Sequence, residues 1–490
     1  MYGFDGNDSL TGSSYDDVID GGTGNDKIYG GSNSGDDTII GGAGDDKLYG
    51  GTSSTSGSGS NTYRFSKGDG KDVIYEYKAE DTDTIEFTDV ASDELRSVER
   101  NGYHLVLKYG DSDQITVSNY FKSSIYQIEQ IRFSDGMTLD SIFIGTAASD
   151  ALSGTAENDW IDAGTGADSL TGGLGNDIYV IDHADDVIIE GSDAGWDEAL
   201  SSVSYSLAAN IEALRLMGGD AISATGNAAA NLLVGNTAAN TLNGGEGADV
   251  LQGGAGADLL VDIAGNNLLD GGSGDDVLQG GTENNLFVGG KGDDVIEAGG
   301  SQDVIFFNQN DGCDTVISAA AGEGTLSLGE GITYADLLFS KSGDDLILST
   351  GTTDQITFKN WYGSAPSRGI ANLQMVIEGS ADYDPSSGDA MRDNAVEQFD
   401  FAGLAAKFDE ARAMTPTLNQ WALSSALAEF HLAGSDIAAI GGDLGYEYGR
   451  NGSFSNISAS QAQALLSSPQ FGIEKQEITR ASGSGVSPGL

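Results

Sequence analysis

The sequence predicts an all-β fold: a parallel β-roll, or β-solenoid, with β-rich flanking modules and a small α-helical C-terminal segment. Three observations lead to this prediction. The pattern G-G-x-G-x-D-x-U-x, in which U is a large apolar residue, recurs with a period of nine. Gly accounts for 73 of the 490 residues. Asp and Glu outnumber Lys and Arg by 76 to 22, which gives a net charge of −54. An aspartate beside the glycines of each repeat would explain both excesses.

The charge and composition exclude several classes of function. A chain this acidic is repelled by phosphate, so we expect neither nucleic-acid binding nor binding to anionic membrane surfaces. The single cysteine, Cys313, cannot form an intrachain disulfide. We expect no transmembrane segment, because no run of about 18 apolar residues occurs. The residues after Met1 have neither the charged region nor the apolar region of a signal peptide.

The first repeat block covers residues 1–60. Residues 21–29 and 41–49 match the full pattern, and 30–40 carry it with two extra residues. Looser copies lie at 3–11 and 12–20. The aspartates at the sixth positions, which we predict to be metal ligands, are Asp8, Asp17, Asp26, Asp37 and Asp46.

Residues 61–144 and 307–380 are predicted to be two copies of one β-rich module. Residues 113–121, DQITVSNYF, match residues 354–362, DQITFKNWY. Alternating apolar and polar residues at 83–87 and 103–107 predict strands in the first copy. The paired aromatic residues could contact a ligand such as a carbohydrate. We favour the alternative that they pack in a lid over the open end of a roll, whose strand edges would otherwise be unpaired.

Two further repeat blocks are predicted, at 145–180 and 226–306. A β insertion at 181–225, with no chemistry of its own, separates them. The predicted ligands of the second block are Asp150, Asp159, Asp168 and Asp177. Those of the third block are Asp249, Asp258, Asp276, Asp294 and Asp303. Asn231, Asn240, Asn267 and Asn285 occupy the remaining sixth positions of the third block.

The chemistry of the repeat favours Ca²⁺. Glycines allow the positive φ angles of a tight turn, in which backbone carbonyls can face inward. Carbonyl and carboxylate oxygens are hard ligands, of which Ca²⁺ takes six to eight. The apolar U residues, such as Leu233 and Leu251, should fill a narrow core. A six-residue turn and a three-residue strand make half a coil, so two repeats should complete one coil.

Alternate repeats should therefore lie on opposite edges of the roll. One edge of the third block carries Asp258, Asp276 and Asp294, each in a full-consensus turn. Two middle turns of the other edge, 262–267 and 280–285, end in asparagine and lack one or more glycines. We expect strong Ca²⁺ sites along the first edge and weak or empty ones along the second. An alternative is that asparagine suffices because backbone carbonyls dominate.

Residues 381–490 are predicted to form a helical C-terminal region with a secretion signal, or a small helical domain. Apolar spacing predicts a helix over 396–414, broken or bent near Gly403. Thr415 and Pro416 are typical of a second helix start, with apolar residues continuing to Phe430. A shorter helix is expected at 458–466. The Ser- and Gly-rich stretch at 478–490 is expected to be disordered.

The repeats resemble the RTX (repeat-in-toxin) family of hemolysin-type calcium-binding proteins, and the module at 61–144 resembles a domain that often flanks such repeats. The resemblance implies Ca²⁺ as the cofactor and an uncleaved C-terminal signal read by the type I secretion machinery. It also implies an extracellular location. Because the chain begins inside a repeat, we expect it to be the C-terminal part of a larger protein.

We expect no enzymatic activity from this chain. The three histidines stand alone in sequence, and no H-E-x-x-H zinc motif occurs. Three functions remain open: a calcium-binding module that folds after secretion, the C-terminal region of an RTX cytolysin or secreted lipase- or protease-like enzyme, and an adhesin that binds a cell-surface or glycan ligand.

Overall fold

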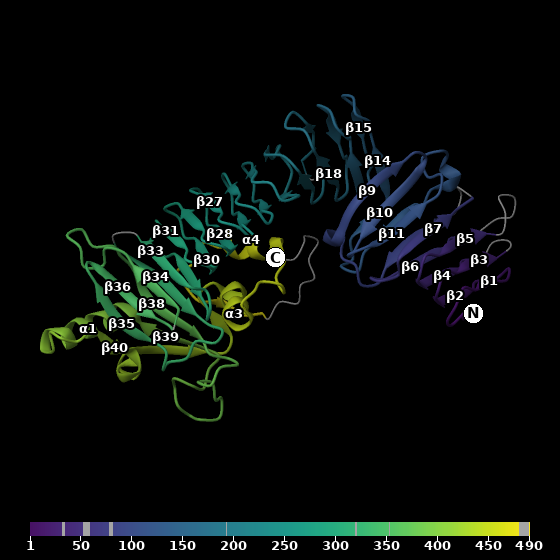
Figure 1. The fold of residues 1–490 in the computed structure, drawn as a ribbon. Coiled ribbons are helices and arrows are strands. Elements are labelled where there is room, and N and C mark those ends of the chain that lie inside the picture. Colours follow the sequence, from purple (N-terminus) through teal and green to yellow (C-terminus); the bar gives the residue numbers. More distant parts are fainter. Residues whose placement is uncertain are drawn as a thin grey trace. The chain divides into compact units, whose positions relative to one another are not determined.

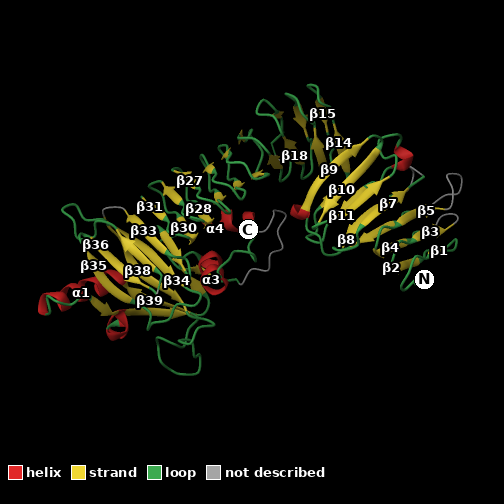
Figure 2. Cartoon of the chain, viewed as in Figure 1, coloured by secondary structure: helices red, strands yellow, loops and turns green. Residues whose placement is uncertain are grey.

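The computed structural model describes residues 1–31, 35–51, 59–77, 82–192, 194–318, 321–351, 353–479 and 490. The chain divides into two compact units, Met1–Tyr179 and Val180–Leu490. Both are built mainly from short strands, and Figure 2 shows most of the helical structure near the C-terminal end of the sequence. Each unit contains a β-solenoid in which successive strands alternate between two parallel sheets. The predicted all-β β-roll class is confirmed.

In unit 1, one sheet contains the parallel strands β1 (Ser9–Thr11), β3 (Lys27–Gly31), β5 (Lys47–Gly51), β7 (Lys71–Tyr75) and β11 (Asp113–Val117). The other contains the parallel strands β2 (Val18–Thr23), β4 (Thr38–Ala43), β6 (Thr62–Phe65), β8 (Thr84–Phe87) and β12 (Gln130–Arg132). The second block of this unit follows with β14 (Ser141–Ile144), β15 (Ala151–Ser153), β16 (Asp159–Asp162) and β17 (Ser169–Thr171). The strand β18 (Ile178–Ile181) spans the boundary between the units.

In unit 2, one parallel row contains β20 (Glu198–Ser201), β22 (Ala213–Leu216), β24 (Leu232–Val234), β26 (Val250–Gln252), β28 (Leu268–Ser273), β30 (Leu286–Lys291), β32 (Val304–Phe307), β34 (Ala321–Leu328) and β38 (Arg368–Val376). The facing row contains β21 (Tyr205–Ser206), β23 (Ser223–Thr225), β25 (Thr241–Asn243), β27 (Leu259–Asp262), β29 (Val277–Gly280), β31 (Val295–Ala298), β33 (Cys313–Ser318) and β37 (Gln355–Phe358). Figure 1 shows several of these labelled strands.

The register confirms that two repeats make one coil. Leu233 pairs with Leu251, and Leu251 with Leu269, so each strand lies beside the strand two repeats later. The apolar U side chains point into the space between the two rows and are at most 1% exposed in the third block. These residues are Leu233, Leu242, Leu251, Leu260, Leu269, Leu278, Phe287, Ile296 and Ile305. The core is therefore a column of stacked aliphatic and aromatic side chains, as the sequence predicts.

The two predicted modules share one topology. In the first, β11 pairs antiparallel with β10 (His104–Tyr109), which pairs antiparallel with β9 (Leu95–Asn101). In the second, β37 pairs antiparallel with β36 (Asp345–Ser349), which pairs antiparallel with β35 (Leu338–Ser342). Each module therefore continues a parallel row by two strands, β7 and β11 in the first and β33 and β37 in the second, and then adds antiparallel strands.

The first aromatic residue of each pair belongs to the core of its module. Tyr120 is 4% exposed and Trp361 is 3% exposed, so the first aromatic residue of each pair is buried. The asparagines before them, Asn119 and Asn360, have φ angles of 63° and 56°. An asparagine tolerates this left-handed conformation, which turns the chain after β11 and β37 and directs the ring inward.

One helix prediction for the C-terminal region is confirmed only in part, and a second is wrong. Residues Val396–Asp400 form strand β39, and helix α1 (Phe401–Met414) begins only after Asp400, whose Oδ1 accepts the Gly403 N–H at 2.7 Å. The helix passes Gly403 without a break. No long helix follows Pro416: Gln420–Ala422 form strand β40, and helix α2 covers only Leu427–Phe430. Pairing of β39 and β40 with sheet edges overrode the helical spacing.

The rest of the C-terminal region contains a confirmed helix and a missed one. Helix α4 (Ala459–Leu466) follows the N-cap Ser458, as predicted. Helix α3 (Gly442–Asn451) was not predicted, because it contains three glycines. Strands β41 (His431–Ser435), β42 (Ala438–Ala439) and β43 (Gln476–Glu477) complete this region. The predicted disorder at 478–490 falls almost entirely outside the described residues.

Candidate calcium-binding turns

The turns between strands bring the sixth-position side chains into rows. In the third block, the backbone N–H of Asp258 donates to Asp276 Oδ1 at 2.7 Å, and that of Asp276 donates to Asp294 Oδ1 at 2.8 Å. Equivalent hydrogen bonds join Asp8 to Asp26 and Asp26 to Asp46 in the first block. Each aspartate therefore uses one carboxylate oxygen to link its coil to the preceding coil.

The rows continue beyond the repeats into the modules. The Asp46 N–H donates to Asp72 Oδ1 at 2.8 Å, and the Asp294 N–H donates to Asp314 Oδ1 at 3.1 Å. The nine-residue period does not predict Asp72 or Asp314, because neither lies nine or eighteen residues from the preceding aspartate of its row. Asp72-Val73-Ile74 and Asp314-Thr315-Val316 nevertheless retain the D-x-U part of the repeat, which was the available signal.

The completely described turns that end in aspartate fall into two geometrical classes. We call a turn open when its second and fourth residues both have positive φ, as Gly272 (93°) and Gly274 (132°) do before Asp276. The open turns are 3–8, 21–26, 41–46, 163–168, 172–177, 244–249, 253–258, 271–276 and 289–294. We call a turn closed when its sixth side chain accepts a backbone N–H from near the start of the same turn.

In the closed turns, the protein itself satisfies the carboxylate. Asp17 Oδ2 accepts the Ser13 N–H at 2.5 Å, and Asp150 Oδ2 accepts the Thr146 N–H at 2.7 Å. Asp159 Oδ2 accepts both the N–H and the hydroxyl of Thr155, at 2.6 and 3.0 Å. Asp303 Oδ2 accepts the Gly300 N–H at 2.8 Å. A backbone donor therefore occupies the place where a cation would bind.

In the open turns, the second carboxylate oxygen faces inward. Among the described residues, a buried Oδ2 without a hydrogen-bond partner occurs at the ends of these open turns: Asp8, Asp26, Asp46, Asp249, Asp258, Asp276 and Asp294. Asp168 and Asp177 also end open turns, and their Oδ1 atoms accept the N–H groups of Asp150 and Asp159. A buried carboxylate oxygen left without a donor is costly unless a cation neutralises it.

In several open turns, a second oxygen faces the same space as the aspartate Oδ2. A methyl group added to Gly253 would lie 2.6 Å from both Asp258 Oδ2 and the carbonyl oxygen of Gly271, in the next coil. At Gly271 the corresponding atoms are Asp276 Oδ2 at 2.5 Å and the Gly289 carbonyl oxygen at 2.6 Å. Carboxylate and carbonyl oxygens from adjacent coils thus converge on a cradle that only glycine leaves vacant, and this donor set suits Ca²⁺.

Burial disfavours the charged form of several of these carboxylates when no counterion is present. It raises the pKa of Asp46 and of Asp258 to about 6, and that of Asp294 to about 7. At the module ends of the rows, burial raises the pKa of Asp72 to about 8 and that of Asp314 to about 9. A bound divalent cation would reverse these shifts by stabilising the charged form.

In the turns that end in Asn267 and Asn285, the side-chain amide forms hydrogen bonds within the turn, so no cation is needed to neutralise a buried charge. The Nδ2 of Asn267 donates to the carbonyl oxygens of Ala264 and Gly265 in its own turn, at 3.2 and 3.1 Å. The Nδ2 of Asn285 donates to the Glu283 carbonyl at 3.1 Å. An amide donor therefore occupies the carbonyl oxygens that a cation would otherwise share, and the side chain carries no charge.

Asp37 is the one predicted ligand whose turn is incompletely described, because residues 32–34 lie outside the described ranges. Its side chain is buried, and its N–H donates to Asn61 Oδ1 at 3.2 Å. Within the described ranges, no group of three or more His, Cys, Asp and Glu side chains could hold a metal ion. Sites in these turns would therefore depend on backbone carbonyls as well as on aspartate.

Other candidate groups are used within the fold. His104 Nδ1 accepts the Asn119 N–H at 3.2 Å, and His431 Nε2 lies 2.7 Å from Glu397 Oε2. The Cys313 thiol donates to the Thr353 carbonyl at 3.4 Å. None of the helices in the described ranges has both the length and the hydrophobicity needed to cross a bilayer.

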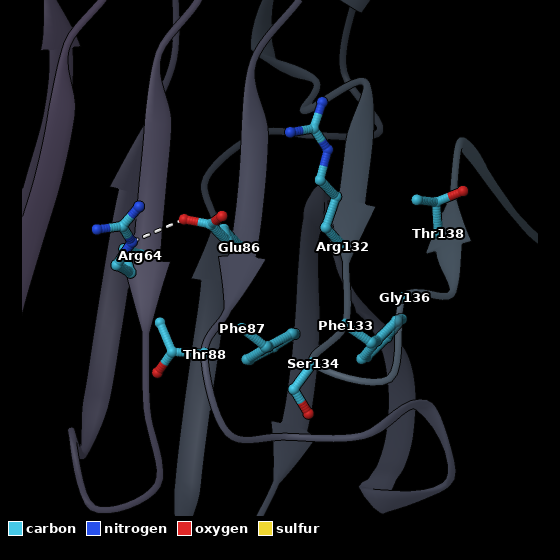
Figure 3. Close-up of a pocket in the computed structure, with 9 residues that line it drawn as sticks. All are labelled: Arg64, Glu86, Phe87, Thr88, Arg132, Phe133, Ser134, Gly136 and Thr138. Carbon is cyan, nitrogen blue, oxygen red and sulfur yellow. Dashed lines mark hydrogen bonds and ion pairs between the residues drawn. The ribbon is translucent and has the colours of Figure 1, made fainter. Parts of the chain in front are cut away.

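A shallow groove of about 350 Å³ lies on the first module (Figure 3). Figure 3 shows Arg64 beside Glu86, with Nε 2.7 Å from Oε2, and Arg132 on the next strand. The Nε of Arg132 donates to Gln130 Oε1 at 2.5 Å. Both arginines already have polar partners on the sheet, and the groove is separate from the rows of aspartates.

Comparison with known protein families identifies the repeats. Residues 2–34, 32–53, 144–179, 225–260, 264–286 and 279–311 match the RTX calcium-binding nonapeptide repeat. Residues 104–141 match the haemolysin-type calcium binding protein related domain, which lies within the first module. The predicted repeat family and its cofactor, Ca²⁺, are confirmed.

Proteins similar to parts of the chain include a curated relative and a solved structure. The iron-regulated protein FrpA of Neisseria meningitidis serogroup C is 36% identical over 121 residues, which are 24% of this chain and 11% of FrpA. The chain thus spans about a tenth of that relative's length. The crystal structure of the extracellular lipase LipA from Serratia marcescens matches 74% of this chain and 37% of its own, at 15% identity and a TM-score of 0.17. That score is too low to support an argument about the fold.

Proposed function

Because this chain is a calcium-binding RTX repeat protein, we propose that it binds Ca²⁺ in its open turns and folds when it does so outside the cell. The supporting observation is the set of buried Oδ2 atoms that face glycine cradles without a hydrogen-bond donor. Under this proposal, only some of the aspartates predicted from the sequence are Ca²⁺ ligands. Asp17, Asp150, Asp159 and Asp303 become structural acceptors in closed turns, and the open-turn aspartates bind the ions.

The coupling of binding to folding follows from charge and concentration. Extracellular Ca²⁺ modules bind with dissociation constants of about 10⁻⁴–10⁻³ M. At about twenty times its dissociation constant, one ion stabilises the folded state by about 1.8 kcal/mol. Several ions together would match a typical domain stability of about 5–15 kcal/mol. At cytosolic Ca²⁺ levels the aspartate rows would repel one another, so the chain would stay unfolded until export.

The route of export is the second part of the proposal. The extracellular location of many repeat proteins of this type favours secretion, and a type I machinery would read a C-terminal signal. In this role the chain binds and folds, and carries out no reaction itself. The buried Tyr120 and Trp361 weaken the adhesin alternative, because they are packed in the module cores.

The coupling can be tested by circular dichroism on the full chain. In EDTA we expect a largely unfolded spectrum, and in millimolar Ca²⁺ the spectrum of a β-rich protein. Mg²⁺ at the same concentration is the control, because it demands a smaller octahedral shell and should not restore the fold. A complete β spectrum in EDTA would refute the proposal.

A further inference from the structure

Asp262 stands where the repeat has glycine, at the first position of turn 262–267. The side chain is completely buried. Its Oδ1 accepts the Ala264 N–H at 3.3 Å, and its Oδ2 has no hydrogen-bond partner among the described residues. The substitution therefore places a second inward carboxylate on the edge of the roll that carries the asparagines.

This carboxylate points into the open turn of the preceding coil, 244–249. A methyl group added to Gly244 would overlap Asp262 Oδ2 and would lie 2.6 Å from Asp249 Oδ2. In the open turns 253–258 and 271–276, the carbonyl oxygen of the next coil's first glycine lies at the corresponding place. In turn 244–249, a second carboxylate oxygen, Asp262 Oδ2, therefore takes the place of that carbonyl oxygen.

The two carboxylates need a partner that the protein does not supply. Asp249 is completely buried, its Oδ1 accepts the Asn231 N–H at 2.7 Å, and its Oδ2 has no hydrogen-bond partner. Within the described residues, neither aspartate forms an ion pair. Burial raises the pKa of both carboxyls, and the neighbouring Asp249 carboxylate raises the pKa of Asp262 further. Either one proton or one cation must occupy the space between them.

We propose that Asp249 and Asp262 jointly hold one Ca²⁺ ion in turn 244–249, with Asp262 as a ligand from outside the repeat consensus. This rests on the proposed calcium-dependent function and adds a site to the edge that the sequence marks as weak. Together, the two carboxylates carry a charge of −2, which neutralises one Ca²⁺ ion. The next turn along this edge holds no ion, because the Asn267 amide donates to the carbonyls of Ala264 and Gly265.

The test is the number of Ca²⁺ ions bound by the full chain, measured by equilibrium dialysis with atomic absorption. Asp262→Asn should bind one ion fewer than the unaltered chain. Asp220→Asn is the matched control: it makes the same change of charge at an exposed aspartate of the same unit, and should leave the count unchanged. Asp262→Gly, which restores the consensus glycine and avoids an unpaired amide, should weaken the site at least tenfold.

The outcomes separate this inference from the general function. If Asp262→Asn and Asp262→Gly retain the full count and the same calcium-induced rise in melting temperature, the carboxylates share a proton and the inference is overturned. If the unaltered chain binds no Ca²⁺, the proposed function itself fails. Loss of a single ion, with folding in Ca²⁺ preserved, supports the site.

Discussion

Asp276 and Asp159 occupy the same position of the repeat, but the backbone of the turn before each one has a different conformation. Before Asp276, Gly272 and Gly274 have positive φ angles, and Asp276 Oδ2 accepts no hydrogen bond from any described residue. Before Asp159, Thr155 occupies the second position and its N–H donates to Oδ2. In this pair of turns, the residue at position two therefore separates an aspartate that is available to a cation from one that is not. A motif search that scores only the aspartate treats these two turns alike.

This contrast predicts that equivalent substitutions will have different effects on Ca²⁺ binding. Asp276→Asn removes a charged ligand from an open turn and should lower the number of bound ions, with a matching loss of thermal stability in Ca²⁺. Asp159→Asn keeps an acceptor for the Thr155 N–H and should cost about 1 kcal/mol or less without losing an ion. Isothermal titration calorimetry measures the number of ions that each variant binds. An equal loss of bound Ca²⁺ from the two variants would contradict the division into open and closed turns.

At the scale of elements, the repeat determines most of the solenoid in advance. The nine-residue period places the U side chains, and therefore the strands and the core, where the structure has them. The same rule identified the edge of Asp258, Asp276 and Asp294 as a continuous row, and the hydrogen bonds between coils join its members. The periodic part was predictable because each repeat meets the same neighbours.

The parts that escaped prediction are those in which tertiary contacts override local pattern. Residues 396–400 have helical apolar spacing, but they pair antiparallel with β38 and so extend the sheet. Asp262 was missed because a single sequence shows a broken repeat there, and only the fold reveals which coil its side chain enters. Asp72 and Asp314 were missed because their spacing leaves the period.

The rows of buried aspartates predict how the metal-free chain responds to pH. The pKa of Asp294 is raised to about 7 and that of Asp314 to about 9, from an ordinary value near 3.8. The folded state therefore binds more protons than the unfolded state, and its stability falls as the pH rises through these values. In metal-free buffer, β structure measured by circular dichroism should increase as the pH is lowered from 9 to 5.

Two comparisons make the pH prediction specific. Saturating Ca²⁺ should flatten the dependence above pH 6, because the ions then take the place of the protons. Asp314→Asn should remove part of the change above pH 7, since asparagine does not titrate. The prediction fails if metal-free β structure is constant or decreases on acidification.

At the scale of the whole molecule, the C-terminal helices α3 and α4 cover one of the two rows of strands in unit 2. The outward side chains of Leu232, Val250, Leu268, Leu286 and Val304 form a buried strip along one row of strands. Helices α3 and α4 cover this strip with Leu444, Tyr448, Ala462 and Leu466. The C-terminal region thus packs against the solenoid along the row whose turns include 262–267 and 280–285.

Asparagines next to the sixth positions fasten this contact. The Nδ2 of Asn266 donates to the Leu466 carbonyl at 2.9 Å, and that of Asn284 donates to the Phe471 carbonyl at 3.1 Å. An aspartate at either position would offer no donor. The asparagine-rich edge is therefore adapted to holding the C-terminal helices, while the opposite edge retains its aspartates.

This packing predicts that calcium loss releases the C-terminal region. Limited proteolysis with mass spectrometry should find residues 441–479 protected in Ca²⁺ and cleaved in EDTA. Tyr448→Ala removes a buried ring that stacks on Phe306 at 5.5 Å, and should cost about 3–5 kcal/mol and expose the same segment even in Ca²⁺. Tyr103→Ala, at a side chain that is 58% exposed, is the control. Protection of 441–479 in EDTA would show that the helices hold without the roll.

The two-repeat coil restricts how such a chain can change length over time. Along each row of the third block, hydrogen-bonded partners are 18 residues apart. Gain or loss of a single nine-residue repeat would exchange the edges for every later coil, moving aspartates onto the helix-covered side and asparagines onto the other. Duplications and deletions of eighteen residues preserve both surfaces. Because one coil contains two repeats, insertions and deletions of eighteen residues are favoured over those of nine, although the sequence period is nine.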